Sequence, residues 1–300
     1  MPPASNVSEN VLRRLELPVV RRLEGILQGD YKSPWRGDGL DLADLREYQY
    51  HDDVRRMDWN ATARLGTPYV RDYIEDREIP VWFLLDMSPS MMFEGVSISK
   101  HSVLMEFTTL MCRLMLSRGN RAGAMIFSGK IDRTIPVRGG RRQLLQILNT
   151  VVGYRPDKGP SATDLKHVLK DAAAAIRRRS LVFLVSDFIS PLDWEKDLTA
   201  LAARHDVIAV RLTDLLETRM PDLGLMNFQD AESGEQLFVD THDRQFQSRF
   251  AAAADAREKA LQGVFEKCGV DVVELATEDD VMDALVRFAA LRKHSMRRSA

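Results

Sequence analysis

Cysteine is scarce in this sequence. Only two of the 300 residues are cysteines, Cys112 and Cys268, and they lie far apart in the chain. Two cysteines cannot build a disulfide framework or a four-ligand zinc site by themselves. Because structural disulfides accumulate in oxidising compartments, this composition favours a reduced, cytoplasmic environment.

Long apolar stretches are also lacking. Residues 1–16 contain no apolar core of the kind found in a signal peptide. Apolar runs such as Val81–Leu85 and Leu181–Val185 are far shorter than the about 20 residues that a membrane helix needs. We therefore expect a protein without a transmembrane segment, located in the cytoplasm.

An excess of charge of one sign is absent as well. Lys and Arg number 42 and Asp and Glu number 44, which leaves a formal net charge of −2. General polyanion binders are usually basic, so we expect no nucleic-acid partner, although Arg55, Arg56, Arg64 and the basic C-terminal residues could provide a local contact. An apolar content of 45% over 300 residues is enough to bury a large core.

From residue 79 onward, the sequence alternates between apolar runs and segments with helical spacing. Continuous apolar runs such as Ile79–Asp86 and Ser180–Asp187 predict strands that are buried on both faces. Two pairs of runs around short turns, 121–137 and 225–240, predict hairpins. This order predicts an α/β fold with a mostly parallel sheet flanked by helices and an inserted β-hairpin.

The N-terminal part has a different pattern. Apolar residues in 9–29 follow helical spacing, which predicts an amphipathic helix bent at Pro18. Residues 30–78 are dense in charge, and we expect loops, a short helix near Asp41–Tyr48 and a strand near Tyr69–Ile74. The expected domains are a helical and charged extension (1–78), an α/β domain (79–292) and a basic tail (293–300).

Two of the predicted strands end in an acidic residue. The first gives Asp86, Ser88 and Ser90 in LLDMSPSM, and the second gives Asp187 in LVSDF. Ligands of open α/β sheets bind at the carboxyl ends of the strands. Carboxylate and hydroxyl oxygens are hard ligands that suit Mg²⁺, with Mn²⁺ or Ca²⁺ as alternatives. A further oxygen should come from the segment before the helix at Leu165.

That segment offers two hydroxyls, Thr163 and, as the alternative, Ser161. Asp86, Ser88, Ser90, Thr163 and Asp187 then follow one another in an order that resembles the metal-ion-dependent adhesion site of von Willebrand factor A-like domains. The resemblance implies an A-like fold whose bound metal is completed by a carboxylate of a partner protein. Pro89 between the two serines is a departure that removes one backbone donor and stiffens the loop.

The preceding segment, LREYQYHDDVRRMDWNATAR, sharpens the resemblance. It is similar to the bacterial family called domain of unknown function 58, in which such a segment precedes an A-like domain. The matching residues are Leu45, Arg46, Tyr48, Asp52, Asp53, Arg55, Arg56, Asp58, Trp59, Ala63 and Arg64. The resemblance implies partner binding without catalysis, with a MoxR-type AAA+ ATPase and a client protein as partners.

Two alternatives remain beside this hypothesis. Asp86 could be the nucleophile of a metal-dependent phosphohydrolase, but such chemistry generally needs a second carboxylate two residues later, where this chain has Ser88. The charged residues between Asp52 and Arg64 could form a partner surface or a second cation site, whereas we favour a network of salt bridges that packs this segment against the α/β domain.

Overall fold

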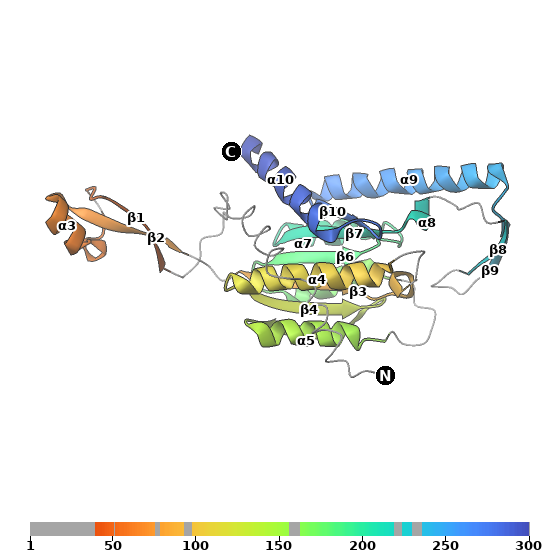
Figure 1. Cartoon of the computed structure of the whole chain (residues 1–300), viewed down its shortest axis with the longest axis horizontal. Helices are drawn as coiled ribbons and strands as arrows, with labels where there is room; N and C mark the ends of the chain where they lie inside the picture. Colours follow the sequence, from red (N-terminus) through yellow and green to blue (C-terminus); the bar gives the residue numbers. More distant parts are fainter. Residues whose placement is uncertain are drawn as a thin grey trace. The chain divides into compact units, whose positions relative to one another are not determined.

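The computed structural model describes residues 40–50, 52–75, 79–92, 98–155, 163–218, 224–229 and 236–299 (Figure 1). The described residues form two compact units, one ending at Ile79 and the other beginning at Pro80. The helix predicted for residues 9–29 lies outside the described residues.

The unit that begins at Pro80 is built on a six-stranded sheet with the order β10-β7-β6-β3-β4-β5. The first five strands in this order are parallel, and β5 pairs antiparallel with β4 at one edge. This confirms the predicted α/β class with a mostly parallel sheet. The strands are β3 (Pro80–Asp86), β4 (Arg121–Phe127), β5 (Ile131–Arg138), β6 (Leu181–Ser186), β7 (Asp206–Thr213) and β10 (Asp271–Ala276).

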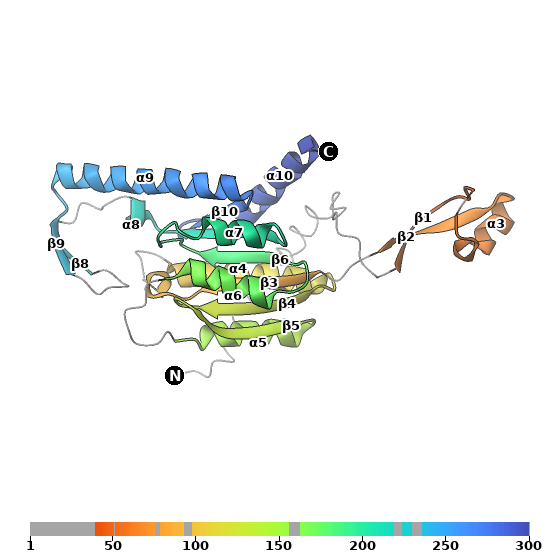
Figure 2. The same ribbon diagram turned by 180° about the vertical axis from the view of Figure 1, so that it is seen from behind.

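Helices cover both faces of this sheet. Alternate residues of β3 point to opposite faces, with Phe83 and Leu85 in one core and Leu84 in the other. The first face is covered by α4 (Lys100–Ser117), α5 (Arg141–Val152) and α10 (Val281–Ser299) (Figure 1). The second is covered by α6 (Leu165–Ala175), α7 (Glu195–Ala202) and α9 (Arg244–Cys268) (Figure 2).

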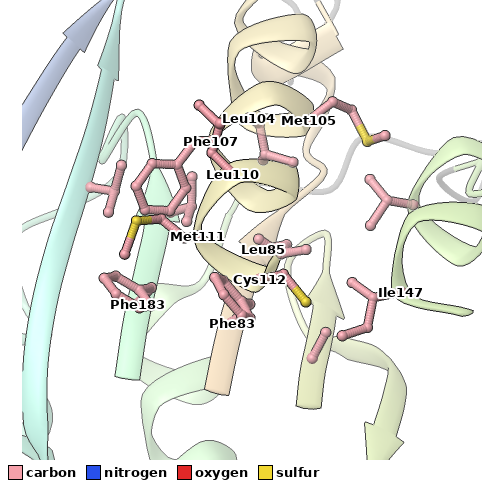
Figure 3. Close-up of a cluster of buried hydrophobic side chains, with 14 of the residues drawn as sticks. Phe83, Leu85, Leu104, Met105, Phe107, Leu110, Met111, Cys112, Ile147 and Phe183 are labelled. Atoms are coloured by element: carbon pink, nitrogen blue, oxygen red, sulfur yellow. The ribbon is translucent and has the colours of Figure 1, made fainter. Parts of the chain in front are cut away.

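Aromatic side chains form the centre of the first core (Figure 3). The rings of Phe83 and Phe183 stack with centroids 5.3 Å apart, and Phe107 of α4 meets Phe183 edge-on at 5.6 Å. All three side chains are almost completely buried. Such pairs stabilise a core by about 0.5–1.5 kcal/mol beyond the burial of their area. This packing fixes α4, and therefore its first residue, against the sheet.

Element boundaries differ from the predictions mainly at the C-terminus. The last helix, α10, continues to Ser299 rather than ending at Arg292, since residues 293–299 contain neither proline nor glycine to end it. The short helix α8 (Leu215–Thr218) was not predicted, because four residues carry no periodicity. The second hairpin is confirmed as β8 (Leu225–Gln229) paired with β9 (Gln236–Asp240).

The smaller unit contains an antiparallel pair of strands, β1 (Leu40–Glu47) and β2 (Tyr69–Glu75). The predicted strand near Tyr69 is confirmed, whereas the helix predicted near Asp41–Tyr48 is wrong. The register shifts between Leu42 and Asp44, so an extra residue breaks the two-residue alternation and hides the strand in the sequence. A 3-10 helix, η1 (Val54–Arg56), and the helix α3 (Trp59–Leu65) connect the two strands.

None of the helices among the described residues combines the length and the apolar character that crossing a bilayer requires.

Candidate functional site

Asp86 is the last residue of β3 and lies beside the end of the neighbouring strand β6. Parallel pairing continues up to Leu85 and Val185, which brings Asp86 next to Ser186. The Ser186 hydroxyl donates a hydrogen bond to Asp86 Oδ2 (2.6 Å), and the backbone N–H of Ser88 donates to Asp86 Oδ1 (2.9 Å). Asp86 is completely buried. Register therefore fixes this carboxylate at the carboxyl edge of the sheet.

The segment after Asp86 turns back over the strand end. Met87 N–H donates to Phe127 O of β4 (2.8 Å), and Pro89 begins the 3-10 helix η2 (Pro89–Met92). A proline is tolerated in the first turn of a helix, where its missing N–H would have no helical acceptor. The hydroxyl oxygens of Ser88 and Ser90 lie 3.0 Å apart. The two serines therefore present their oxygens together, beside the carboxylate of Asp86.

Asp187 follows β6 in a strained turn. Its Oδ1 accepts a hydrogen bond from Ile189 N–H (3.0 Å), and Phe188 N–H donates to the Ser186 hydroxyl (3.0 Å). Phe188 has a φ of 55°, a left-handed conformation that residues other than glycine rarely adopt. The buried ring of Phe188 packs against Trp194 and Phe265, and this packing offsets the strain.

Lys100, the first residue of α4, enters the site from the side. Its Nζ lies 2.7 Å from Asp187 Oδ2 and 2.5 Å from Oε1 of Glu217, which belongs to α8. The side chains of Lys100 and Asp187 are each 3% exposed, and that of Glu217 is 25% exposed. The sequence analysis missed Lys100 and Glu217. The position of Lys100 in the first turn of a predicted helix was one available signal. The helix dipole disfavours a lysine there unless carboxylates hold it.

The pKa values report an excess of negative charge in this region. Burial, and then the neighbouring charge of Asp187, raise the pKa of Asp86 to about 7, against the opposing hydrogen bonds from Ser186 and Ser88. Burial lowers the pKa of Lys100, but the carboxylates of Asp187 and Glu217 outweigh it and leave that pKa raised. Lys100 is therefore held as an ammonium, while no cationic side chain among the described residues pairs with Asp86.

Thr163 is buried directly before α6, whose first turn is capped by the Asp164 side chain. Since α6 leads into the parallel strand β6, its beginning lies at the edge where β6 ends. The structure thus places Thr163 at the same edge, whereas hydrogen bonds and electrostatic contacts join Asp86, Ser88, Ser90 and Asp187. The alternative ligand Ser161 lies outside the described residues.

Polar contacts continue along this edge to the next two strands. Asp214 follows β7, and its Oδ2 accepts a hydrogen bond from the hydroxyl of Thr277, which follows β10 (3.0 Å). The Asp214 N–H donates to Glu217 Oε2 (3.4 Å), so the same network holds the glutamate that contacts Lys100. The ends of β10, β7, β6 and β3 therefore carry one connected set of polar side chains.

The donor set fits a divalent cation. Lys100 contacts the carboxylates of Asp187 and Glu217, and Asp187 in turn lies near the carboxylate of Asp86. These four side chains carry a formal charge of −2 when all are ionised. A divalent ion would neutralise that charge, and the adjacent serine hydroxyls are ligands that Mg²⁺ accepts. Among the residues that the structure describes, no three His, Cys, Asp or Glu side chains gather to hold a metal, so hydroxyls would have to supplement the carboxylates.

The charged segment between Asp52 and Arg64 serves local structure. Asp52 forms a two-pronged ion pair with Arg46, with both N–O distances 2.7 Å. Asp53 caps η1 through the N–H of Arg55, and Asp58 caps α3. These contacts agree with the expected salt bridges only within the smaller unit, and capping was not foreseen as the role of Asp53 and Asp58.

Relatives cover nearly all of this chain. It is 35% identical over 284 residues to the uncharacterized proteins Rv1480 of Mycobacterium tuberculosis and Mb1516 of Mycobacterium bovis, which spans 94% of this chain and 89% of each relative. It is also 32% identical over 166 residues to the uncharacterized protein MAV169 of Mycobacterium avium, covering 53% of this chain and 94% of that protein.

Solved structures match more distantly. BatB from Bacteroides thetaiotaomicron matches 72% of this chain and 99% of its own, with 12% identity and a TM-score of 0.48. An aerotolerance-related membrane protein from Bacteroides fragilis matches 71% and 97%, with 13% identity and a TM-score of 0.46. A von Willebrand factor type A protein from Catenulispora acidiphila matches 87% and 50%, with 11% identity and a TM-score of 0.41. Values this low transfer no ligand or partner to this chain.

A comparison with models of protein families confirms the resemblance of the segment around Asp52 and Asp58. Residues 44–260 match the family model described as "Protein of unknown function DUF58". This match covers both the smaller unit and most of the sheet. Together with the mycobacterial relatives, it establishes that the chain belongs to the DUF58 family.

Proposed function

We propose that this protein is a divalent-metal-dependent module that binds another protein and does not itself catalyse a reaction. The observation that carries the proposal is the pair of buried carboxylates, Asp86 and Asp187, beside the hydroxyls of Ser88 and Ser90 at one edge of the sheet. Burial of two carboxylates with one ammonium is costly unless a further cation joins them.

Each residue would have a definite role. The hydroxyls of Ser88, Ser90 and Thr163 are the direct ligands, and Asp86 and Asp187 supply charge. A Mg²⁺ ion held in this way would keep outer coordination positions for water or for a carboxylate of the partner. The strained turn at Phe188 and the hydrogen bonds to Asp86 keep the donors oriented before any cation arrives.

The surroundings of Asp86 support a role without catalysis. Both of its carboxylate oxygens already accept hydrogen bonds, and the residue is completely buried. A nucleophilic aspartate needs an oxygen that reaches the substrate, and a phosphohydrolase would also need an acid–base group where this chain has Ser88. We therefore favour binding over the phosphohydrolase alternative.

The partner that we propose is a MoxR-type AAA+ ATPase acting on a client protein in the cytoplasm. This partner is what the resemblance of the segment that carries Arg46, Asp52 and Asp58 implies, and the family match itself names no partner. An acidic side chain on the ATPase or on the client would complete the coordination of Mg²⁺.

Calorimetric titration of the full chain with Mg²⁺ and with Mn²⁺ tests the metal site. We expect binding by the unmodified chain and a loss of at least about tenfold in affinity for Ser88→Ala and Thr163→Ala, since each removes a ligand. Thr150→Ala is the matched control, because its hydroxyl donates a hydrogen bond to Gln146 O within its own helix, α5. If neither metal binds the unmodified chain, the proposal fails.

Capture of the partner tests the second half of the proposal. The chain is mixed with the nucleotide-free ATPase, so that a chelator acts on the metal site and not on Mg–ATP. We expect co-elution with Mg²⁺ that is lost with chelator and in Ser88→Ala. Co-elution that is insensitive to both would contradict a metal-dependent contact.

A further inference from the structure

The ammonium of Lys100 is buried between two carboxylates, in a position that is unusual for a lysine. It lies between two carboxylates from different elements, Asp187 after β6 and Glu217 in α8, and its side chain is 3% exposed. Burying a lysine charge is costly unless the geometry of its partners is very good. The contact with Asp187, at 2.7 Å, has the length of a charge-assisted hydrogen bond, and Glu217 supplies a second carboxylate.

Lys100 contacts the carboxylate whose charge a cation in the proposed site would use. The two oxygens of Asp187 have different partners: Oδ1 accepts a hydrogen bond from the backbone N–H of Ile189, whereas Oδ2 carries the contact with a cation. Lys100 Nζ is bound to this Oδ2. An ammonium and a divalent cation would therefore compete for the charge of the same carboxylate.

Glu217 is a second carboxylate that can bind the Lys100 ammonium. Its side chain is 25% exposed, and its other oxygen, Oε2, accepts a hydrogen bond from Asp214 N–H. Because Glu217 lies on α8 and not on the strand end, it can hold Lys100 after Asp187 has been given up. The short helix α8 is itself fixed by the Asp214 cap on Leu216 N–H (2.9 Å).

We propose that Lys100 is the resident counter-ion of Asp187, that a divalent cation replaces it there, and that Glu217 retains the displaced ammonium. This inference rests on the proposed metal-dependent function and concerns its regulation. Metal occupancy is then linked to the contact between α4 and α8, and by reciprocity a partner that strengthens the Lys100–Glu217 contact strengthens metal binding.

Variants of the two residues test the exchange in opposite directions. Calorimetry with Mn²⁺ and Mg²⁺ on the full chain should give an affinity at least about tenfold tighter for Lys100→Met and at least about threefold weaker for Glu217→Gln. In the Lys100→Met background, Glu217→Gln should change affinity less than about twofold, because its effect passes through the lysine. Additive effects would indicate simple charge attraction and would overturn the inference.

Lys166→Met is the matched control. Lys166 stands three residues after Thr163 and pairs with Asp193 at 2.9 Å, but its side chain is 42% exposed. Its removal takes away the same charge near the same edge without freeing Asp187. We expect less than about a twofold change in affinity, and a tenfold gain here would overturn the specific role of Lys100.

A direct measurement keeps the inference testable if Lys100→Met does not fold. In the unmodified chain, the ¹⁵Nζ resonance of Lys100 should shift when Mg²⁺ saturates the site, and its coupling to the Asp187 carboxylate should disappear while that to Glu217 stays. An unchanged resonance with metal bound would overturn the exchange.

The outcomes also separate this inference from the proposed function. Metal binding by the unmodified chain with equal or weaker affinity in Lys100→Met overturns only the role of Lys100. If Lys100→Met binds metal and the unmodified chain does not, the result supports Lys100 as the resident cation. The same result overturns the metal dependence of the natural chain. If neither protein binds metal, both proposals are overturned.

Discussion

Two ion pairs of similar length lie in the two units of this protein and have very different surroundings. Lys100 and Asp187 meet at 2.7 Å at the sheet edge with both side chains 3% exposed. Arg46 and Asp52 also meet at 2.7 Å in the smaller unit, but their side chains are 37% and 18% exposed. Distance alone therefore says little about what an ion pair contributes, because solvent screens the exposed pair and the buried pair depends on its partners.

The acidic residues of the two units differ in the same way. The hydrogen bond from Arg46, with help from Gln49 N–H, lowers the pKa of Asp52 to about 2. Burial and the charge of Asp187 raise the pKa of Asp86 to about 7. One aspartate is satisfied by its neighbours, whereas the other is short of positive charge. A site that needs a cation is expected at the second kind of position.

The cores of the two units differ in how much apolar surface they bury. The sheet is covered on both faces, so its strand ends are removed from water. The smaller unit buries Ala61 and Val70 but leaves large apolar side chains exposed. Its exposed side chains include Leu45, Tyr50, Val54, Trp59 and Leu65. Asp58 of the smaller unit is buried as well, but its carboxylate accepts the backbone N–H groups of Asn60 and Ala61, which it caps.

The largest expected change in stability comes from truncating an aromatic side chain of the first core. Phe183→Ala should lower the free energy of unfolding of the sheet unit by about 4 kcal/mol, because it empties the space between Phe83 and Phe107. Val70→Ala in the smaller unit should cost about 1.5 kcal/mol and should affect amide-exchange protection only there. Urea denaturation and hydrogen exchange measure the two losses of unfolding free energy. Equal losses from Val70→Ala and Phe183→Ala would contradict the difference between the two cores.

Breaking each ion pair gives the next effect. In metal-free protein, Lys100→Met should cost about 3 kcal/mol of unfolding free energy, because it leaves Asp187 buried without its partner. Arg46→Met should leave the urea midpoint unchanged within error, since its pair is screened by water. Equal midpoints for the two variants would show that burial does not distinguish the pairs.

The pH dependence of stability should follow Asp86. Its folded pKa is raised above the unfolded value of 3.8, so the folded state binds the proton more tightly and metal-free protein loses stability as pH rises from about 4 to about 7. Asp86→Asn should flatten this slope, and saturating Mg²⁺ should flatten it in the unmodified chain. Thermal unfolding at several pH values measures it, and a slope of opposite sign in metal-free protein would contradict the assignment.

The smallest effect should be alike in both units. Gly66 ends α3 with a φ of 75°, and Gly269 ends α9 with a φ of 63°. A Cβ at either position meets nothing within 4 Å, so alanine would cost only backbone strain, about 1 kcal/mol. Amide exchange for α3 and urea denaturation for the sheet unit should report these losses. A loss above about 3 kcal/mol at either glycine would indicate contacts other than the helix cap.

Much of the sheet unit could be predicted from the sequence, because its strands are continuous apolar runs and its helices have regular spacing. The smaller unit was harder. A bulge after Leu42 interrupts the two-residue alternation of β1, so the strand could not be predicted from its pattern. The helix α3 is too short to show a clear helical periodicity among its charged neighbours. Of the five predicted ligands, hydrogen bonds join Asp86, Ser88 and Ser90, which are close in sequence, and Asp187 lies near enough to Asp86 to raise its pKa.

The sequence by itself determined the layered sheet and the row of oxygen-bearing residues at its strand ends, because apolar periodicity and chain order are local properties. Only the tertiary structure decided that Lys100 and Glu217, 117 residues apart in the chain, belong to the same site. Their meeting depends on how α4 packs on the sheet and where α8 follows β7. That long-range packing also removes water, and it makes the charge balance of Asp86, Asp187 and Lys100 the deciding feature of the site.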